Sequence, residues 1–473
     1  MKLLPRDFFY SLSLIGLLLL ISGCNSSYIE DVKRGSDYAY QPGHPELRTE
    51  IAGVISSSQQ LKLLVSGSIP KNSLVFKKDE DNLQAKVSIE IEIRNTDQNK
   101  AESFNYPIKL DRSLSTSGFE DDIYLFNKEF NVSPGNYAVT VAATDQATGK
   151  TTIRSDEVNL PDLEEEVTNI TNIRIFAKAE ELNNNFFPVT TYDVSLAADS
   201  LKFEFQLFNS TSDPVTLQAR LIKFRSDSSY SSPMSFVNRS SSSIKYKGID
   251  YRDFEVIQST QRQLSQPGNV TIEFAFENLP RGNYRFEVSP NLNDKETLYK
   301  ARDFSIKSNN YPSVKSAEEL AAPLIYLMPD KEYEELMAIE NSDSLKAAID
   351  RFWLSNIQNS ALARNIISLY YQRVEEANKL FSNFKEGWKT DMGMVYILLG
   401  PPLYQNRSLN EIQWSYNYNA SLPEYTFYFK RSKSKSDFYP FDHYILQRDN
   451  TYFQIEYRVK QLWLSGSIIN SNI

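Results

Sequence analysis

Residues 387–402 read GWKTDMGMVYILLGPP, and this stretch decides how the C-terminal third of the chain is interpreted. It follows a segment with helical periodicity, opens on a glycine-containing turn and stops at Gly-Pro-Pro. The apolar run inside it, 394–399, predicts a short buried strand. Alternating segments at 411–416, 424–431 and 443–448, and a further one at 451–459 after an Asp-Asn turn, predict an antiparallel sheet. We therefore expect an α+β domain over residues 316–473, a helical lead-in packed on a sheet.

The helical lead-in is predicted from caps and periodicity. Ser316 and Glu319 have the spacing of a capping box. Asp330 is expected to cap a helix over 331–339, and another helix is expected over 344–354. The longest is predicted at 361–384, where an apolar stripe runs along one face: Ile366, Tyr370, Val374, Ala377 and Phe381.

The middle of the chain has a two-residue period instead. Residues 87–93 place Val87, Ile89, Ile91 and Ile93 on one face, as in a half-buried antiparallel strand. Residues 201–208 and 270–276 alternate in the same way. We predict two all-β modules, at 46–162 and 168–308, with a charged linker between them.

A Gly-Asn-Tyr turn recurs near the end of both modules, and a hairpin loop and a last strand follow it each time. Tyr137 and Tyr284 hold the matching places. We expect each ring to lie in a core and each hydroxyl to bond nearby backbone, a device of immunoglobulin-like sandwiches. Both modules are therefore predicted to be such sandwiches. The serine-rich stretch 226–243 is interpreted as a flexible surface loop in preference to a binding loop.

The opening stretch resembles the signature of GWxTD-domain proteins, since Gly387, Trp388, Thr390 and Asp391 hold its named positions. The resemblance extends over roughly residues 316–460 through further family-like segments: Phe352-Trp353, Tyr371-x-Arg373-Val374-x-x-Ala377-Asn378-x-x-Phe381, Val395-Tyr396-Ile397, Gly400-x-Pro402 and Glu411-x-x-Trp414-x-Tyr416. It implies an exported bacterial protein, commonly a lipoprotein, with β modules ahead of the domain. It implies no established enzymatic activity.

The chain departs from that family pattern in its charges. Many members have arginine after the motif aspartate, where this chain has Met392, and another cation where it has Met394. Residues 355–358 replace an acidic-proline segment of the family. If those family charges pair with Asp391, the pair is altered here.

Four residues are candidates for binding: Trp388, Asp391, Glu411 and Trp414. Asp391 and Glu411 are the acid pair that general acid–base chemistry would need. The two tryptophans, with Tyr396 and Tyr416 nearby, suggest a platform for a sugar ring.

A structural interpretation of the same motif is simpler, and we prefer it. Trp388 would fill a core, while Thr390 and Asp391 would bond backbone groups of the turn. Gly387 and Gly393 would permit unusual dihedral angles. No catalytic residue is assigned.

The N-terminus reads as a lipoprotein signal. Lys2 and Arg6 precede an apolar run, 14–21, that is shorter than the roughly 20 residues of a bilayer span. It closes with Ile21-Ser22-Gly23-Cys24. We predict a signal peptide at 1–23, lipid attachment at Cys24 through acyl chains such as palmitate, and a polar tether over 24–45. Asn25 is not an aspartate, so we expect the outer membrane of a Gram-negative bacterium.

Composition excludes several kinds of chemistry. Cys24 is the one cysteine of the chain, so disulfides and thiolate catalysis are excluded once it is lipidated. His44 and His443 are the two histidines, and neither has a context typical of a zinc site or a catalytic triad. No metal or cofactor is expected. The net charge of −9 argues against a nucleic-acid partner.

Two main functions remain open from the sequence, beside a third, a component of a secretion or assembly machine whose sandwiches pack against like copies. The first is a non-enzymatic interaction or scaffold protein, anchored to the membrane by lipid, in which the β modules project the C-terminal domain towards an envelope protein partner. The second is a glycan-binding or glycan-processing envelope protein that uses Trp388 and Trp414 with Asp391 and Glu411. Burial of those rings in a core would count against the second.

Overall fold

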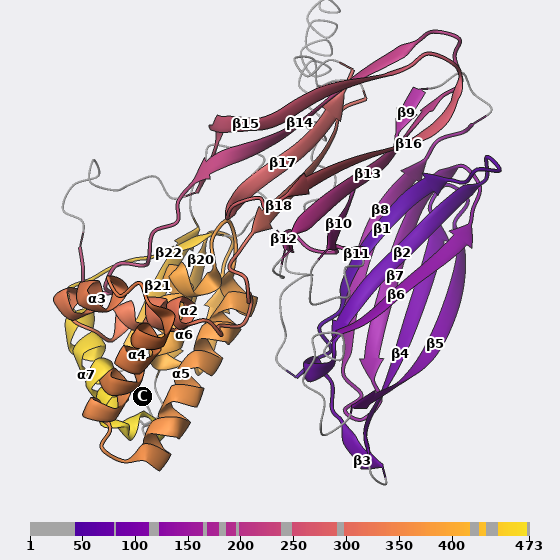
Figure 1. Cartoon of the computed structure of the whole chain (residues 1–473). Helices are drawn as coiled ribbons and strands as arrows, with labels where there is room; N and C mark the ends of the chain where they lie inside the picture. The colour runs from indigo at the N-terminus through magenta and orange to yellow at the C-terminus, as the bar shows by residue number, and fades with distance from the viewer. Residues whose placement is uncertain are drawn as a thin grey trace, which may run out of the picture.

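The computed structural model describes residues 43–79, 82–112, 123–163, 168–178, 186–194, 198–237, 248–290, 298–416, 425–431 and 443–470. Two β modules come first, and a helical region with a small sheet follows (Figure 1). The predicted signal peptide, Cys24 and most of the tether lie outside the described residues.

The first β module pairs a three-stranded sheet with a five-stranded one. The first sheet has the order β1-β2-β6, and the second runs β3-β4-β7-β8 with β5 also on β4. Alternate side chains such as Val65, Ile89 and Val139 point between the sheets and form one apolar core. The elements are β1 (Arg48–Ile55), β2 (Leu61–Pro70), η2 (Lys71–Ser73), β3 (Lys77–Asp79), β4 (Asn82–Asn95), β5 (Lys100–Arg112), β6 (Ile123–Asn131), β7 (Gly135–Asp145) and β8 (Thr151–Leu160).

The second module also has two facing sheets. Their orders are β11-β10-β13-β16, with β9 on β13, and β12-β18-β17-β14-β15. Stacked phenylalanines fill the core: the Phe203 and Phe286 ring centroids lie 4.6 Å apart. The strands are β9 (Thr168–Ile170), β10 (Arg174–Lys178), β11 (Phe186–Pro188), β12 (Asp193–Val194), β13 (Ser200–Asn209), β14 (Val215–Ser226), β15 (Ile249–Leu264), β16 (Gly268–Glu277), β17 (Gly282–Ser289) and β18 (Lys300–Ile306).

The repeated tyrosine does in both modules what its position predicts. Tyr137 and Tyr284 are buried, on β7 and β17. The Tyr137 hydroxyl donates to the Ser133 carbonyl at 2.9 Å, and the Tyr284 hydroxyl donates to the Pro280 carbonyl. Each bond reaches back four residues across the turn, so the expectation is confirmed at both sites.

The helical region surrounds a sheet of order β19-β20-β21-β22. The predicted capping box at Ser316 and Glu319 is present. Asp330 is not a cap, because it is the first residue of its helix and Pro329 precedes it. The elements are α2 (Ala317–Ala321), η6 (Ala322–Tyr326), α3 (Asp330–Met337), α4 (Ser342–Asn356), α5 (Ser360–Phe381), η7 (Gly387–Lys389), α6 (Asp391–Leu399), β19 (Tyr404–Arg407), β20 (Glu411–Tyr416), β21 (Tyr425–Arg431), β22 (Tyr444–Leu446), α7 (Tyr452–Ser465) and η8 (Ser467–Asn470).

Two segments predicted as strands are helices. Residues 394–399 belong to α6, in which every residue from Gly393 to Leu399 is buried. A helix buried on all sides has no polar face, so its sequence reads like a buried strand. Residues 452–459 belong to α7, whose buried positions Tyr452, Ile455, Val459 and Trp463 follow a helical spacing. The sheet therefore has four described strands and a helix at each end of its sequence.

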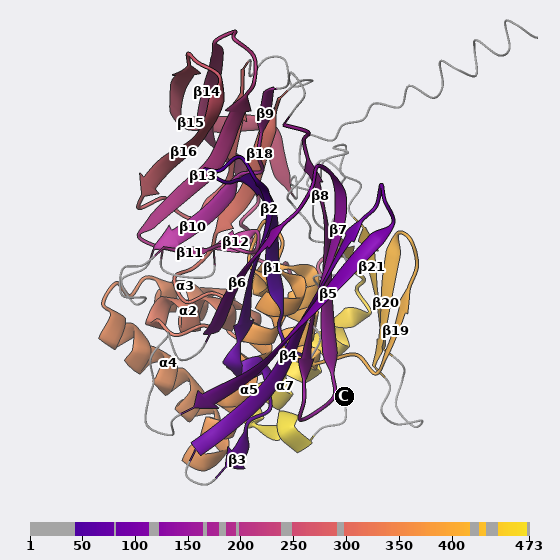
Figure 2. The ribbon, with the colours of Figure 1, turned by 90° about the vertical axis from the view of Figure 1, so that its right-hand side faces the viewer.

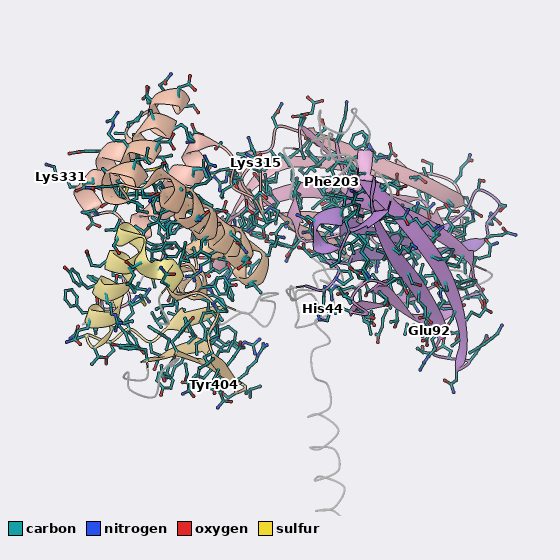
Figure 3. All side chains as sticks on the ribbon, turned by 90° about the horizontal axis from the view of Figure 1, so that it is seen from below. His44, Glu92, Phe203, Lys315, Lys331 and Tyr404 are labelled. Carbon is teal, nitrogen blue, oxygen red and sulfur yellow. The ribbon has the colours of Figure 1, made fainter. Side chains whose placement is uncertain are left out.

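The three parts touch one another instead of following in a line. The backbone of Ile55 in the first module bonds Gln206 of the second at 2.7 and 2.8 Å. Glu46, at the start of the first module, bonds Lys379 of α5 at 2.7 Å. The first module therefore contacts the C-terminal domain directly as well as the second module. Figure 2 gives the side view of this arrangement, and Figure 3 labels Lys315 between the second module and the helical region.

Candidate functional site

The GWxTD motif forms a tight turn between α5 and α6, and its glycines are set by close packing. A Cβ on Gly387 would lie 1.9 Å from the Ala377 carbonyl oxygen, and one on Gly393 would lie 1.9 Å from the Gly387 carbonyl oxygen. Neither glycine has a φ angle in the left-handed region. The prediction that they permit unusual dihedral angles is therefore wrong, because neighbouring backbone is what excludes a side chain here.

Thr390 caps α6 and closes the turn. Its hydroxyl accepts from the Gly393 backbone N–H at 3.0 Å and donates to the Gly387 carbonyl at 2.7 Å. A hydroxyl at this position satisfies one of the free N–H groups at the start of a helix. The predicted bond of Thr390 to turn backbone is confirmed.

Asp391 lies in a largely shielded ion pair that the sequence did not reveal, with 12% of its side chain exposed. Its carboxylate meets the Arg448 guanidinium with two bonds of 2.7 and 2.9 Å and accepts from the Leu446 backbone N–H at 2.8 Å. The Ser231 hydroxyl also donates to it. Burial alone would raise the pKa of Asp391, but the Arg448 charge and these hydrogen bonds outweigh it, so the pKa lies below its ordinary value. Asp391 thus bonds a distant strand and loop, not its own turn.

Trp388 lies in an aromatic sandwich. The Tyr230 ring stacks on it with centroids 5.5 Å apart, and the Tyr326 ring meets it edge-on at 6.2 Å. Its backbone N–H donates to Asn378, and its carbonyl accepts from the Tyr326 hydroxyl. Only 6% of Trp388 is exposed. The prediction that it fills a core is confirmed.

Glu411 and Trp414 point to opposite faces of the small sheet. Trp414 is buried against Phe381 and Phe429 on the side facing the helices. Glu411 lies an odd number of residues away on the same strand, on the other face, directly across from Lys430. The structure therefore brings Trp388 and Asp391 together and leaves the other two candidates elsewhere. Tyr396 and Tyr416 are also buried, so the four rings offer no open stacking surface.

The residues that face the motif come from the serine-rich loop of the second module. Its described part, residues 227–237, is called the strap. Met234 is fully buried in the apolar core of the helical region. The Arg448 guanidinium donates to the Ser232 and Pro233 carbonyls at 3.0 and 3.1 Å. Ser235 bonds Glu456 of α7 through its backbone N–H and its hydroxyl. The described part of the loop is bound to the domain, so its interpretation as a flexible surface excursion is wrong.

Residues 383–386, called the joint, bind the motif's leading edge to the second module. Phe384 is buried in a cluster with Tyr192, Ile222, Phe224 and Ile249 of that module. Its carbonyl accepts from the Asn283 amide at 2.9 Å. The last two residues of the joint form ion pairs. Lys385 pairs with Asp227 at 2.9 Å, and Glu386 pairs with both Arg281 and Lys389. The motif therefore sits at the contact between two parts of the chain.

Sequence reasoning missed Arg448, Ser231 and Met234. The resemblance suggested an arginine where the chain has Met392, which packs against the core, and another cation where it has Met394, which is buried. In this chain the cation that pairs with Asp391 is Arg448, 57 residues away. A carboxylate followed by a mostly apolar stretch is expected to pair with a cation, and this was the available signal. Nothing in the sequence identifies which cation it is.

Three further observations concern metal ligands, membrane spans and His443. Among the described residues, no group of histidine, cysteine, aspartate and glutamate side chains is placed to hold a metal ion. Within the same residues, no helix is both long and apolar enough to cross a membrane. His443 is buried, with Nδ1 3.1 Å from the Asn383 amide and its ring against Phe384. His443 therefore packs against the joint.

Known structures resemble the chain only weakly. A red sea bream transglutaminase matches with a TM-score of 0.18 and 8% identity, over 55% of this chain and 31% of that one. An Escherichia coli alpha-2-macroglobulin, trypsin-activated, matches at 0.17 and 10%, over 57% and 17%. A DUF4785 family protein of Legionella pneumophila matches at 0.16 and 11%, over 53% of each chain. This chain thus spans between a sixth and about half of the length of these proteins, and no functional conclusion follows from likenesses of this size.

No curated protein matches the sequence significantly. The family model of the GWxTD domain does match, and it covers residues 290–465. The matched region contains the motif, Arg448 and α7, and it reaches back into the second module to include β18. Residues 290–465 of this chain are therefore a GWxTD domain.

Proposed function

We propose that the protein is a lipid-anchored, non-enzymatic interaction or scaffold protein of the bacterial cell envelope. Cys24 would carry the lipid, and the outer membrane of a Gram-negative cell would be its location. Two immunoglobulin-like modules would place the GWxTD domain against an envelope protein partner. The short apolar segment that ends at Cys24 supports the anchor.

One observation carries the interaction role: the GWxTD motif holds a polypeptide segment. The groups that a catalytic interpretation would use are already engaged, Asp391 by Arg448 and Ser231, and Trp388 by Tyr230. The second acid of the proposed pair, Glu411, lies on the outer face of the sheet. The glycan alternative depends on exposed rings, and these rings are buried, so it loses its support.

Crosslinking in intact cells tests the partner. The tagged full chain is crosslinked, extracted from the envelope in detergent and captured, and the attached proteins are identified by mass spectrometry. We expect a reproducible envelope protein that is lost in a joint variant, Phe384→Ala, and kept in Tyr404→Ala, a change at an aromatic residue of the edge strand β19 that is 69% exposed. Capture of no reproducible protein would count heavily against the proposal.

A separate experiment tests the anchor. Cells are fed labelled palmitate, and the membrane fraction is examined for label on the protein. Wild-type chain should carry label and sediment with outer membranes, whereas Cys24→Ala should carry none. Label on the Cys24→Ala chain would place the lipid elsewhere, and an unlabelled wild-type chain would rule the anchor out.

A further inference from the structure

The strap meets the GWxTD domain as a peptide ligand meets a receptor. Arg448 donates to two consecutive strap carbonyls, Ser232 and Pro233, which any sequence would offer. Two strap side chains are buried against the domain: Ser231, 8% exposed, and Met234, fully buried. Ser232 and Pro233 between them are exposed. The partly exposed Tyr230 ring stacks on Trp388 beside these residues. Main-chain bonds that give affinity, with a few pockets that give specificity, are the usual mode of peptide recognition.

The receiving surface is organised without the strap. The bidentate Asp391–Arg448 pair and the Leu446 backbone bond all lie within the domain, and they fix the guanidinium in place. Thr390 and Gly393 fix the start of α6 and therefore the carboxylate. A guanidinium held by a carboxylate on one side keeps its other N–H groups directed at the ligand.

The far end of the contact has apolar side chains in solvent. Beyond Ser235, which bonds Glu456, the strap leaves Phe236 57% and Val237 40% exposed. Glu456 lies on α7 between Phe453 and Tyr457, which are also exposed. One buried anchor residue, the Tyr230 ring on Trp388 and a row of hydrogen bonds therefore hold the strap, and its apolar end is not covered by the described part of the domain.

We propose that the GWxTD domain is a peptide-binding module and that the strap is its resident, displaceable ligand. The partner is a protein segment that can adopt the strap's backbone, which turns at Met234 and Ser235 with the Phe236 N–H on the Pro233 carbonyl. It has a small hydroxyl residue three positions before an unbranched apolar residue, the pattern of Ser231 and Met234. Its backbone carbonyls take the Arg448 N–H groups that the strap uses. This deepens the proposed interaction role, and it assigns Asp391 the task of positioning Arg448.

The strap competes with a free peptide for the site as part of the same chain. A segment of the same chain competes at an effective concentration of about millimolar, so a free peptide of equal intrinsic affinity is largely excluded. A chain whose strap is disabled has no such competitor, and its site is open to the same peptide.

The experiment uses the detergent-solubilised full chain and a fluorescent synthetic peptide of residues 227–237, DSSYSSPMSFV. The strap is disabled by Ser231→Ala with Met234→Asp. We expect this variant to bind the peptide at least ten-fold more tightly than wild-type chain does. Binding should be lost when the peptide carries Met234→Asp, and when Arg448→Ala is added to the receptor. A folded double variant that binds no better than wild type, or that binds the altered peptide equally, would overturn the proposal.

A second measurement needs no variant and so does not depend on the double mutant folding. Hydrogen exchange of the wild-type chain is followed with and without millimolar peptide. Displacement should speed exchange of the strap amides while the amides of the first module stay unchanged. Strap amides whose exchange is unaffected would overturn displaceability. Because neither measurement involves a cell or a lipid, failure here leaves the envelope partner and the anchor to be judged by their own experiments.

Discussion

Asp391 has a structural role in the motif, not a catalytic one. Its carboxylate is a partly buried counter-ion that holds Arg448, and the same guanidinium holds the strap. Thr390, Gly387 and Gly393 shape the turn that carries it. Capping and close packing explain the other residues of the motif. The aspartate side chain bonds residues outside its own turn.

Replacing the paired carboxylate of Asp391 should therefore cost more than replacing that of Glu411. We expect Asp391→Asn to lower the free energy of unfolding by about 2 kcal/mol at neutral pH, because Arg448 loses the charge of its partly buried partner. Glu411→Gln should change it by less than about 0.5 kcal/mol. Urea denaturation measures both. Equal effects would mean that Asp391 is not the structural counter-ion described above.

The same residue gives the acid dependence a sign. The pKa of Asp391 lies below its ordinary value of 3.8 in the folded chain, so its ionisation stabilises the fold above that pH. The stabilisation is lost as pH falls below 3.8 towards the folded pKa. The stability difference between wild type and Asp391→Asn should be constant from pH 5 to 7 and shrink below about pH 4. Denaturation at a series of pH values checks this, and a difference that grows on acidification would contradict it.

The close packing at Gly393 of the motif gives a steric prediction. Gly393→Ala should destabilise the chain by about 3 kcal/mol, because the new Cβ meets the Gly387 carbonyl, a backbone atom that cannot swing away. Gly149→Ala is the contrasting variant: it has open space but a φ of +71°, so the cost should be only about 1 kcal/mol. Thermal unfolding compares the two. A smaller loss for Gly393→Ala would show that the turn relaxes.

At the scale of elements, the sequence predicted what alternation or caps could decide. Strands with one buried face, such as β4 and β13, were located because their period is two. α5 was located by its stripe. The segment now in α6 was predicted as a strand because burial on all sides removes the period. α7 was missed although Tyr452, Ile455, Val459 and Trp463 are spaced by three or four residues, since its first half also fits alternation.

The tyrosines of the two Gly-Asn-Tyr turns give a matched pair of predictions. Tyr137→Phe and Tyr284→Phe each remove one hydroxyl-to-carbonyl bond across a turn and leave the ring in place. Each should lower the free energy of unfolding by about 1 kcal/mol. Tyr404→Phe, on the exposed edge strand β19, should have no measurable effect. If the corner variants behaved like Tyr404→Phe, the hydroxyls would have no structural role.

At the scale of the whole molecule, the site could not be predicted because it is assembled from distant segments. Ser231 and Asp391 are 160 residues apart in the chain, and they meet only because the joint packs on the second module. A single sequence gives no signal for such pairing. What it did give was the motif, one of the two sides of the contact. The other side, the strap, has a composition typical of a loop, and its binding depends on geometry that only the folded chain provides.

The joint also determines whether the molecule unfolds as one body. Phe384 is 3% exposed and inserts into a cluster of the second module, so Phe384→Ala should remove about 3 kcal/mol of contact between the two parts. Calorimetry of wild type should show the second module and the GWxTD domain unfolding together, and the variant should show two separated transitions. Phe453→Ala, on a residue 63% exposed, is the control and should keep the single transition. Separate transitions already in wild type would mean that the joint and the strap are too weak to couple the parts, and a single transition in Phe384→Ala would mean that the strap couples them alone.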